Sequence, residues 1–109
     1  MLTDKRVVIT GGATGIGKAT AIHFAKLGAT LVLGDNNEEG GNHTVEYIQE
    51  QGGTASFLPL NVSKEASVRE FALSAENILG RVDILIASAG VFREALTPVE
   101  DVDERSWDF

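Results

Sequence analysis

The chain has no cysteine, two prolines, one tryptophan and one tyrosine among its 109 residues. The absence of cysteine excludes disulfide bonds, thiolate zinc sites and thiol catalysis. No stretch approaches the 18 continuous apolar residues that would indicate a transmembrane helix. The first residues also lack the basic, apolar and small-residue regions of a signal peptide. We therefore expect a cytoplasmic protein that has no membrane partner.

Basic residues are scarce as well, with 9 Lys and Arg against 16 Asp and Glu, and the net charge is −7. Because no basic stripe is present to neutralise phosphates, we expect no nucleic-acid partner. The two histidines, His23 and His43, are isolated from other ligands at metal spacing, so we expect no metal site. A chain of this length fits at most one domain.

The most informative feature that is present is a glycine cluster directly after an apolar strand at residues 7–9. Gly11, Gly15 and Gly17 have the spacing G-x-x-x-G-x-G. Glycines there permit a tight turn and let backbone N–H groups approach a pyrophosphate, and a helix N-terminus adds about half a positive charge. A purely structural turn is the alternative. Context favours the phosphate site, because a second strand at residues 30–33 ends in Asp35, where dinucleotide folds place the carboxylate that binds a ribose.

Strands and helices alternate along the chain. We expect strands at residues 7–9, 30–33, 55–60 and 82–87, and helices at 17–28, 38–51 and 64–79. Ser63 is predicted to cap the third helix, and Gly40-Gly41 to fray the start of the second. A capping box at Thr97 and a further helix from Asp103 are expected near the end of the chain. Right-handed crossovers then predict a doubly wound parallel α/β sheet of order 3-2-1-4, which binds ligands at its carboxyl edge.

At this point a resemblance to a known family becomes specific. The segment TGGATGIG, from Thr10 to Gly17, resembles the TGxxxGIG signature of the short-chain dehydrogenase/reductase family. The segment GKATAIHFAKLGATLVLGD resembles that family's first helix and second strand. Asn61-Val62-Ser63, VDILIASAG and Trp107 resemble later family segments. The likeness covers essentially all 109 residues.

The resemblance implies a Rossmann-type domain over residues 1–109, belonging to an NAD(P)-dependent oxidoreductase that transfers hydride between a nicotinamide and an alcohol or carbonyl substrate. It implies that the pyrophosphate lies on the backbone of the glycine turn, the adenosine ribose at the end of the second strand, the adenine beyond the third, and the other ribose beyond the fourth. The residues implied for the pyrophosphate are Gly11, Thr14, Gly15, Ile16 and Gly17. Those for the adenosine ribose are Asp35 and Asn36, those for the adenine are Asn61 and Val62, and those for the other ribose are Ser88, Ala89 and Gly90. Asp35 would repel the 2′-phosphate of NADP, and positions 14 and 36 carry no Lys or Arg, so we predict NAD as the preferred cofactor.

Two departures from the family pattern carry predictions. Ala87 and Ser88 replace asparagines of the family's NNAG segment, and losing one hydrogen bond would weaken cofactor binding by about 1 to 2 kcal/mol. The family's catalytic Tyr-x-x-x-Lys pair is also missing, since the only tyrosine, Tyr47, is followed by Ile-Gln-Glu-Gln. We therefore predict no catalytic residue here, and a domain truncated after the fourth strand and the start of the next helix. A substrate would bind only if the remaining half were supplied.

One other function and one other assembly stay open. The chain could be a stand-alone dinucleotide-binding or interaction module that performs no redox chemistry. Alternatively, two copies could pair across the edge of the fourth strand, or a separate chain could supply the rest. Residues 84–86 would expose unpaired backbone and apolar side chains at that edge, so we expect a homo-oligomer.

Overall fold

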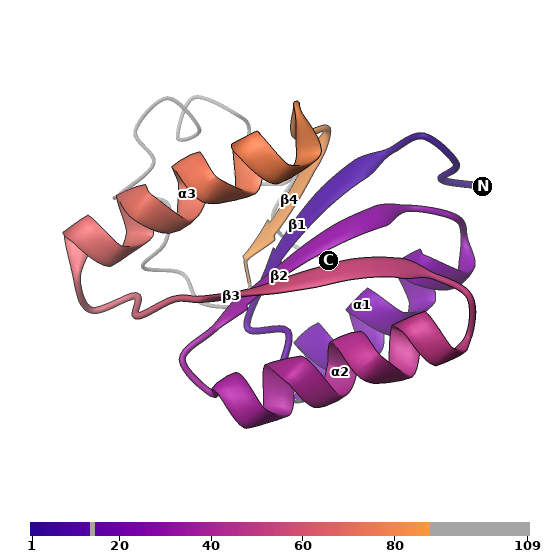
Figure 1. Cartoon of the computed structure of the whole chain (residues 1–109), viewed down its shortest axis with the longest axis horizontal. Coiled ribbons are helices and arrows are strands. Elements are labelled where there is room, and N and C mark those ends of the chain that lie inside the picture. Colours follow the sequence, from indigo (N-terminus) through magenta and orange to yellow (C-terminus); the bar gives the residue numbers. More distant parts are fainter. Residues whose placement is uncertain (14, 88–109) are drawn as a thin grey trace.

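A computed structural model describes residues 1–13 and 15–87 of the chain. Its four parallel strands have the order β3-β2-β1-β4 (Figure 1), which confirms the predicted topology. The strands are β1 (Arg6–Thr10), β2 (Thr30–Asp35), β3 (Thr54–Pro59) and β4 (Ile84–Ala87), and they alternate with α1 (Gly15–Lys26), α2 (Glu38–Glu50) and α3 (Glu65–Leu79). The predicted capping box at Thr97, the helix from Asp103, and Trp107 lie outside the described residues.

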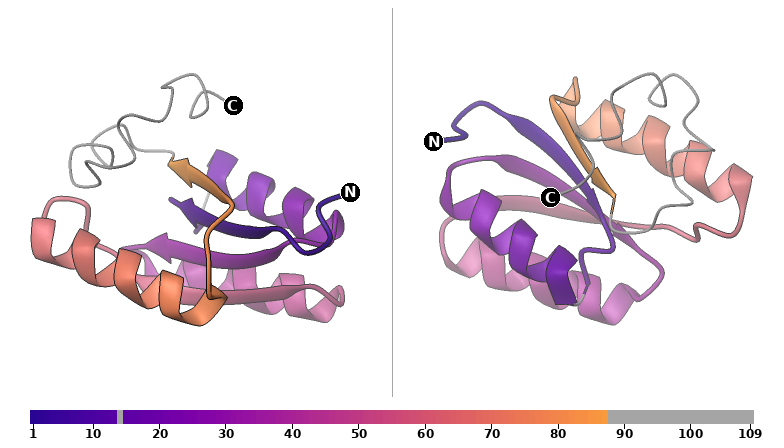
Figure 2. Two further views of the ribbon diagram at one scale, coloured as in Figure 1. Left: turned by 90° about the horizontal axis from the view of Figure 1, so that it is seen from above. Right: turned by 180° about the vertical axis from the view of Figure 1, so that it is seen from behind.

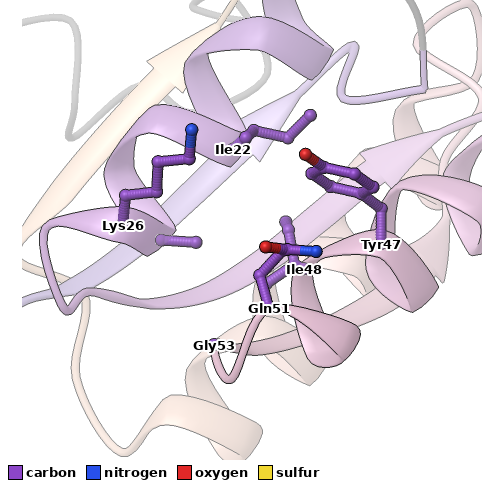
Figure 3. A pocket seen from close by; sticks show the side chains of 7 residues that line it. Ile22, Lys26, Tyr47, Ile48, Gln51 and Gly53 are labelled. Carbon is purple, nitrogen blue, oxygen red and sulfur yellow. The ribbon is translucent and has the colours of Figure 1, made fainter.

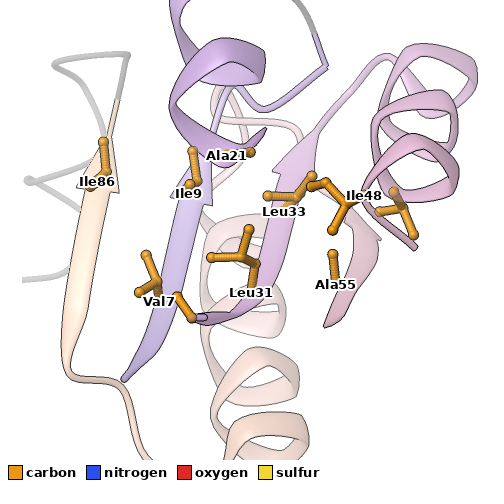
Figure 4. Close-up of a cluster of buried hydrophobic side chains, with 10 residues drawn as sticks. Val7, Ile9, Ala21, Leu31, Leu33, Ile48, Ala55 and Ile86 are labelled. Carbon is orange, nitrogen blue, oxygen red and sulfur yellow. The ribbon is translucent and has the colours of Figure 1, made fainter. Parts of the chain in front are cut away.

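The helices cover both faces of the sheet (Figures 1 and 2), with α1 and α2 on one face and α3 on the other. Successive side chains of a strand point to opposite faces, so β1 supplies Val7 and Ile9 to one core and Val8 to the other. The core beneath α1 and α2 is shown in Figure 4 and includes Leu31, Leu33 and Ile48. None of the described helices combines the length and apolar character needed to cross a membrane.

The start of α2 is firmly held, so the predicted fraying at Gly40-Gly41 is wrong. The side-chain oxygen of Asn37 caps the helix by accepting a hydrogen bond from the Gly40 N–H at 2.9 Å. A Cβ on Gly41 would lie 2.1 Å from Cε1 of Phe57, so the glycine lets the helix approach β3 closely. Tertiary packing has overridden the low helix propensity of glycine.

The start of α3 also differs from the prediction, because Ser63 is not its cap. The helix begins at Glu65, and Lys64 at the capping position makes no side-chain capping bond. The Ser63 hydroxyl instead donates to Oδ1 of Asn61 at 2.6 Å. Asn61 therefore competes successfully for the group that would have capped the helix.

Four residues join the chain at the amino ends of β1 and β4, and we call them the N-terminal clasp: Asp4, Arg6, Arg81 and Asp83. Asp83 accepts a hydrogen bond from the Arg6 backbone N–H at 2.8 Å and from Nε of Arg81 at 3.1 Å. Arg81 also donates to the Asp4 carbonyl, and the Arg6 guanidinium donates to the Leu79 carbonyl at the end of α3. β4 begins at Ile84 and not at the predicted residue 82, although the Asp83 backbone N–H still donates to the Arg6 carbonyl at 2.8 Å. The backbone hydrogen bond from Arg6, followed by Arg81, lowers the pKa of the Asp83 carboxyl.

Candidate functional site

The glycine turn connects β1 to α1 at the carboxyl edge of the sheet. Gly11 and Gly15 have φ angles of 78° and 59°, which favour glycine. The Gly11 N–H donates to the Gly34 carbonyl at 2.7 Å, so the turn is tied to β2. A Cβ on Gly17 would lie 1.8 Å from the Gly11 carbonyl oxygen, so α1 packs directly on the turn. The result is a backbone cradle in front of a helix N-terminus whose first turn has no acidic residue.

Asp35, the last residue of β2, reaches this turn. Its Oδ2 accepts a hydrogen bond from the Ala13 N–H at 3.2 Å, and its Oδ1 accepts one from the Asn37 N–H at 2.9 Å. The carboxylate thus joins the glycine turn to the beginning of α2. Each oxygen has a second lone pair, so the carboxylate can still accept hydrogen bonds from a ligand.

A hollow of about 170 Å³, which we call the inner hollow, lies at this edge of the sheet. The predicted site residues that line it are Gly11, Asp35, Asn36 and Val62. It therefore gathers groups from the ends of β1, β2 and β3, as a ligand site at the carboxyl ends of parallel strands would. Its remaining lining residues are Thr10, Gly34 and Leu60.

Sequence reasoning missed these three residues. Gly34 was recognisable from its position, because a glycine inside an apolar strand pattern often marks a close approach. A Cβ there would lie 2.5 Å from Cε1 of Phe71 on α3. Thr10 was recognisable as the first residue of the TGxxxGIG signature, whereas Leu60 gave no comparable signal.

A larger hollow of about 470 Å³, the outer hollow, shares Asn36 and Leu60 with the inner one and extends between β3 and α3. Asn61 lines this outer hollow. Its side-chain oxygen accepts from both the backbone N–H and the hydroxyl of Ser63, at 3.0 and 2.6 Å. Its own backbone N–H donates to Oγ of Ser67 at 3.0 Å. The segment after β3 is therefore held by a small polar network.

Not every predicted site residue lines a hollow. Gly15, Ile16 and Gly17 form the first turn of α1 beside the cradle, with Ile16 80% exposed. The predicted residues Thr14, Ser88, Ala89 and Gly90 lie outside the described part of the chain.

Tyr47 lies elsewhere, on α2, and is 41% exposed. It borders a hollow of only about 20 Å³ between α1 and α2 (Figure 3), together with Ile22, Lys26 and Gly53. That space has room for about one water molecule. Gly53 precedes β3, so this hollow lies at the opposite end of the strands from the glycine turn. Over residues 1–13 and 15–87, no group of three or more His, Cys, Asp or Glu side chains could hold a metal ion.

Comparisons with known proteins agree with this geometry. The profile of the short chain dehydrogenase family matches residues 5–109. The cyclopentanol dehydrogenase of Comamonas sp. (strain NCIMB 9872) is 39% identical over 110 residues, which cover 98% of this chain and 42% of that protein. The chain spans about two fifths or less of the first curated relatives that it matches.

Solved structures match the fold. A 7α-hydroxysteroid dehydrogenase in complex with NADH and 7-oxo glycochenodeoxycholic acid superimposes with a TM-score of 0.76 at 41% identity, covering 78% of this chain and 33% of that one. A short chain dehydrogenase/reductase from Burkholderia phymatum in complex with NAD gives a TM-score of 0.75 at 34% identity, covering 78% and 30%.

Proposed function

Since the chain belongs to the short chain dehydrogenase family, we propose that it binds NAD at the carboxyl edge of its sheet. We further propose that it forms the dinucleotide-binding part of an oxidoreductase acting on an alcohol or carbonyl group. The observation that carries the proposal is the convergence of the glycine turn and the Asp35 carboxylate on one hollow. When bound, the nicotinamide would accept or supply hydride.

The residues present fit such a dinucleotide. The positive φ angles of Gly11 and Gly15, and the lack of space for a Cβ at Gly17, form a turn whose backbone N–H groups can approach a pyrophosphate. In this proposal the N–H groups of Thr14, Gly15 and Ile16 bind the pyrophosphate.

The other contacts follow the order of the strands. Asp35 accepts hydrogen bonds from the adenosine ribose, and Asn61 and Val62 border the base. Ser88, Ala89 and Gly90 contact the second ribose. Each group follows the carboxyl end of a strand, so the dinucleotide would cross that edge of the sheet.

The charge at the ribose position favours NAD over NADP. A 2′-phosphate would lie near the Asp35 carboxylate, and the adjacent Asn36 carries no positive charge to balance it. Two like charges about 4 Å apart repel by roughly 1 kcal/mol even in water, and by more near a protein surface. Because about 1.4 kcal/mol corresponds to tenfold in affinity, we expect NAD to bind at least tenfold more tightly than NADP.

Calorimetric titration of the purified chain with NAD and with NADP tests this expectation. Asp35→Asn is the matched variant, because it removes the charge with little change in shape, and it should narrow the difference between the two cofactors. Its thermal unfolding should be measured alongside, since Asp35 also holds the glycine turn. Equal or tighter binding of NADP by the unmodified chain would contradict the preference.

The 109 residues should bind the cofactor without turnover. They contain no Tyr-x-x-x-Lys pair, and their only tyrosine, Tyr47, lies on α2 away from the glycine turn. We therefore propose that no side chain of these 109 residues moves a proton to or from a substrate oxygen. Alcohol-dependent formation of NADH, followed at 340 nm, should stay at the level of a protein-free control, and turnover by the purified chain would refute this part of the proposal.

A further inference from the structure

The strand β3 lies at one edge of the sheet (Figure 1), and β2 is its one neighbour among the strands of residues 1–13 and 15–87. An edge strand presents unpaired backbone groups to which a strand of another chain can add. The sequence of β3, TASFLP, contains apolar and aromatic residues and no charged one. Such a strand favours pairing with the same strand of a second copy unless some feature of the edge prevents it.

The backbone groups of Ala55, Phe57 and Pro59 point away from β2, and we call these residues the outward row. Backbone groups of alternate residues point to opposite sides of a strand. The N–H of Leu60, directly after β3, donates to the Asp35 carbonyl of β2 at 2.9 Å. The even-numbered residues of β3 therefore face β2, and the odd-numbered residues face outward.

Both ends of the outward row differ from an ordinary edge. Pro59 has no backbone N–H to donate. At the other end, Nε2 of Gln49 donates a hydrogen bond to the Ala55 carbonyl at 3.2 Å. Because a carbonyl can only accept, the atom of Gln49 that faces it must be the amide nitrogen. Gln49 belongs to α2, so its amide occupies the position that the backbone of an added strand would need.

We propose that Gln49 and Pro59 together keep β3 from pairing with β3 of a second copy. Two identical strands related by a two-fold axis run antiparallel, and Phe57, the middle of the outward row, then lies opposite Phe57 of the second copy. Ala55 lies opposite Pro59 in a pair that should exchange two hydrogen bonds. The bond from residue 59 to the Ala55 carbonyl cannot form, because proline lacks the donor.

Gln49 and Pro59 therefore act on the same hydrogen bond of that pairing. A second copy must displace the Gln49 amide from the Ala55 carbonyl, and Pro59 of that copy cannot replace the donor that is lost. The acceptor would be left unsatisfied at both ends of the symmetric pair, which opposes association. Registers centred on Ala55 or on Pro59 meet the same two obstacles at their centre.

The test uses the variants Gln49→Ala and Pro59→Ala and the double variant that combines them. Gln49→Ala frees the position but supplies no donor, and Pro59→Ala supplies the donor but leaves the Gln49 amide in place. Only the double variant removes both obstacles, so its association constant should exceed that of either single variant by at least about tenfold. Gln51→Ala is the matched control, because it makes the same change two residues along the chain.

Sedimentation equilibrium measures the association constants, and amide hydrogen exchange followed by NMR shows where the copies meet. On raising the protein concentration, exchange of the Phe57 N–H should slow by about tenfold in the double variant. It should keep its rate in the unmodified chain, in both single variants and in Gln51→Ala. Pairing across β4 would not cover Phe57, so slower exchange there reports pairing at β3. Thermal unfolding establishes that each variant is folded.

Concentration-dependent protection of Phe57 in the unmodified chain would overturn the inference without any variant. An unchanged exchange rate of Phe57 in the folded double variant would also overturn it. If either single variant associated as tightly as the double variant, the joint action of Gln49 and Pro59 would be refuted. These outcomes are independent of the proposed binding of NAD, which is measured separately.

Discussion

Replacing Gly17 by alanine tests whether the close approach of α1 to the glycine turn is essential to the fold. The added Cβ would lie 1.8 Å from the Gly11 carbonyl oxygen and 2.6 Å from its carbon. Both are backbone atoms, so no side-chain rotation can relieve the clash. Reaching a separation of 3.0 Å would require a shift of about 1.2 Å in the turn or the helix.

The expected cost follows from what such a shift disturbs. Overpacking costs about 1 to 3 kcal/mol. The hydrogen bonds from Gly11 to Gly34 and from Ala13 to Asp35 contribute about 1 kcal/mol each if they are lost. Alanine returns up to about 1 kcal/mol through its higher helix propensity. We therefore expect the free energy of unfolding to fall by about 2 to 4 kcal/mol.

Urea denaturation followed by circular dichroism measures this loss, and Gly15→Ala provides the matched control two residues away. A Cβ on Gly15 meets no atom within 4 Å, but the φ of 59° remains unfavourable for alanine. That strain alone should cost about 1 to 2 kcal/mol. If Gly17→Ala were no more destabilising than Gly15→Ala, the argument from close packing would be refuted.

Two further predictions concern the clasp and the contact between α2 and β3. Asp83→Asn should destabilise the chain at pH 7 but progressively less toward pH 2. The pKa of Asp83 is lowered from its ordinary 3.8 by the Arg6 N–H and Arg81, so the contribution of the carboxylate to stability is present at higher pH and disappears as the carboxylate is protonated. Urea denaturation of both proteins at several pH values measures this difference in stability, and a difference independent of pH would contradict the prediction. Gly41→Ala should cost about 1 to 2 kcal/mol because the new Cβ meets the Phe57 ring, and Phe57→Leu in the same chain should recover part of that loss in a double-mutant cycle, whereas strictly additive costs would exclude a direct contact.

The strand order and the position of the glycine turn beside Asp35 could be predicted because they depend on local patterns in the sequence. The apolar runs at Val7 and Leu31 mark buried parallel strands, and the glycine spacing followed by Asp35 marks the turn and the end of β2. Right-handed crossovers then leave few arrangements of such elements. The fold was therefore accessible from local signals and general topology.

The errors have a different origin, since each depends on a contact between two residues and not on the type of one residue. Ser63 has the residue type of a helix cap, but its hydroxyl donates a hydrogen bond to the side-chain oxygen of Asn61 instead. Gly41 has poor helix propensity, but Phe57 fills the space beside it. Single-residue propensity does not contain such pairings.

The position of β1 in the sheet has a consequence for the order of folding. Val7 pairs with Leu31 in β2, 24 residues along the chain, and with Ile84 in β4, 77 residues along. Closing the longer loop costs about 1 kcal/mol more in chain entropy. We therefore expect β1 and β2 to associate first, with β4 joining afterwards as the clasp forms. Substitutions in the clasp should then accelerate unfolding and leave the refolding rate almost unchanged.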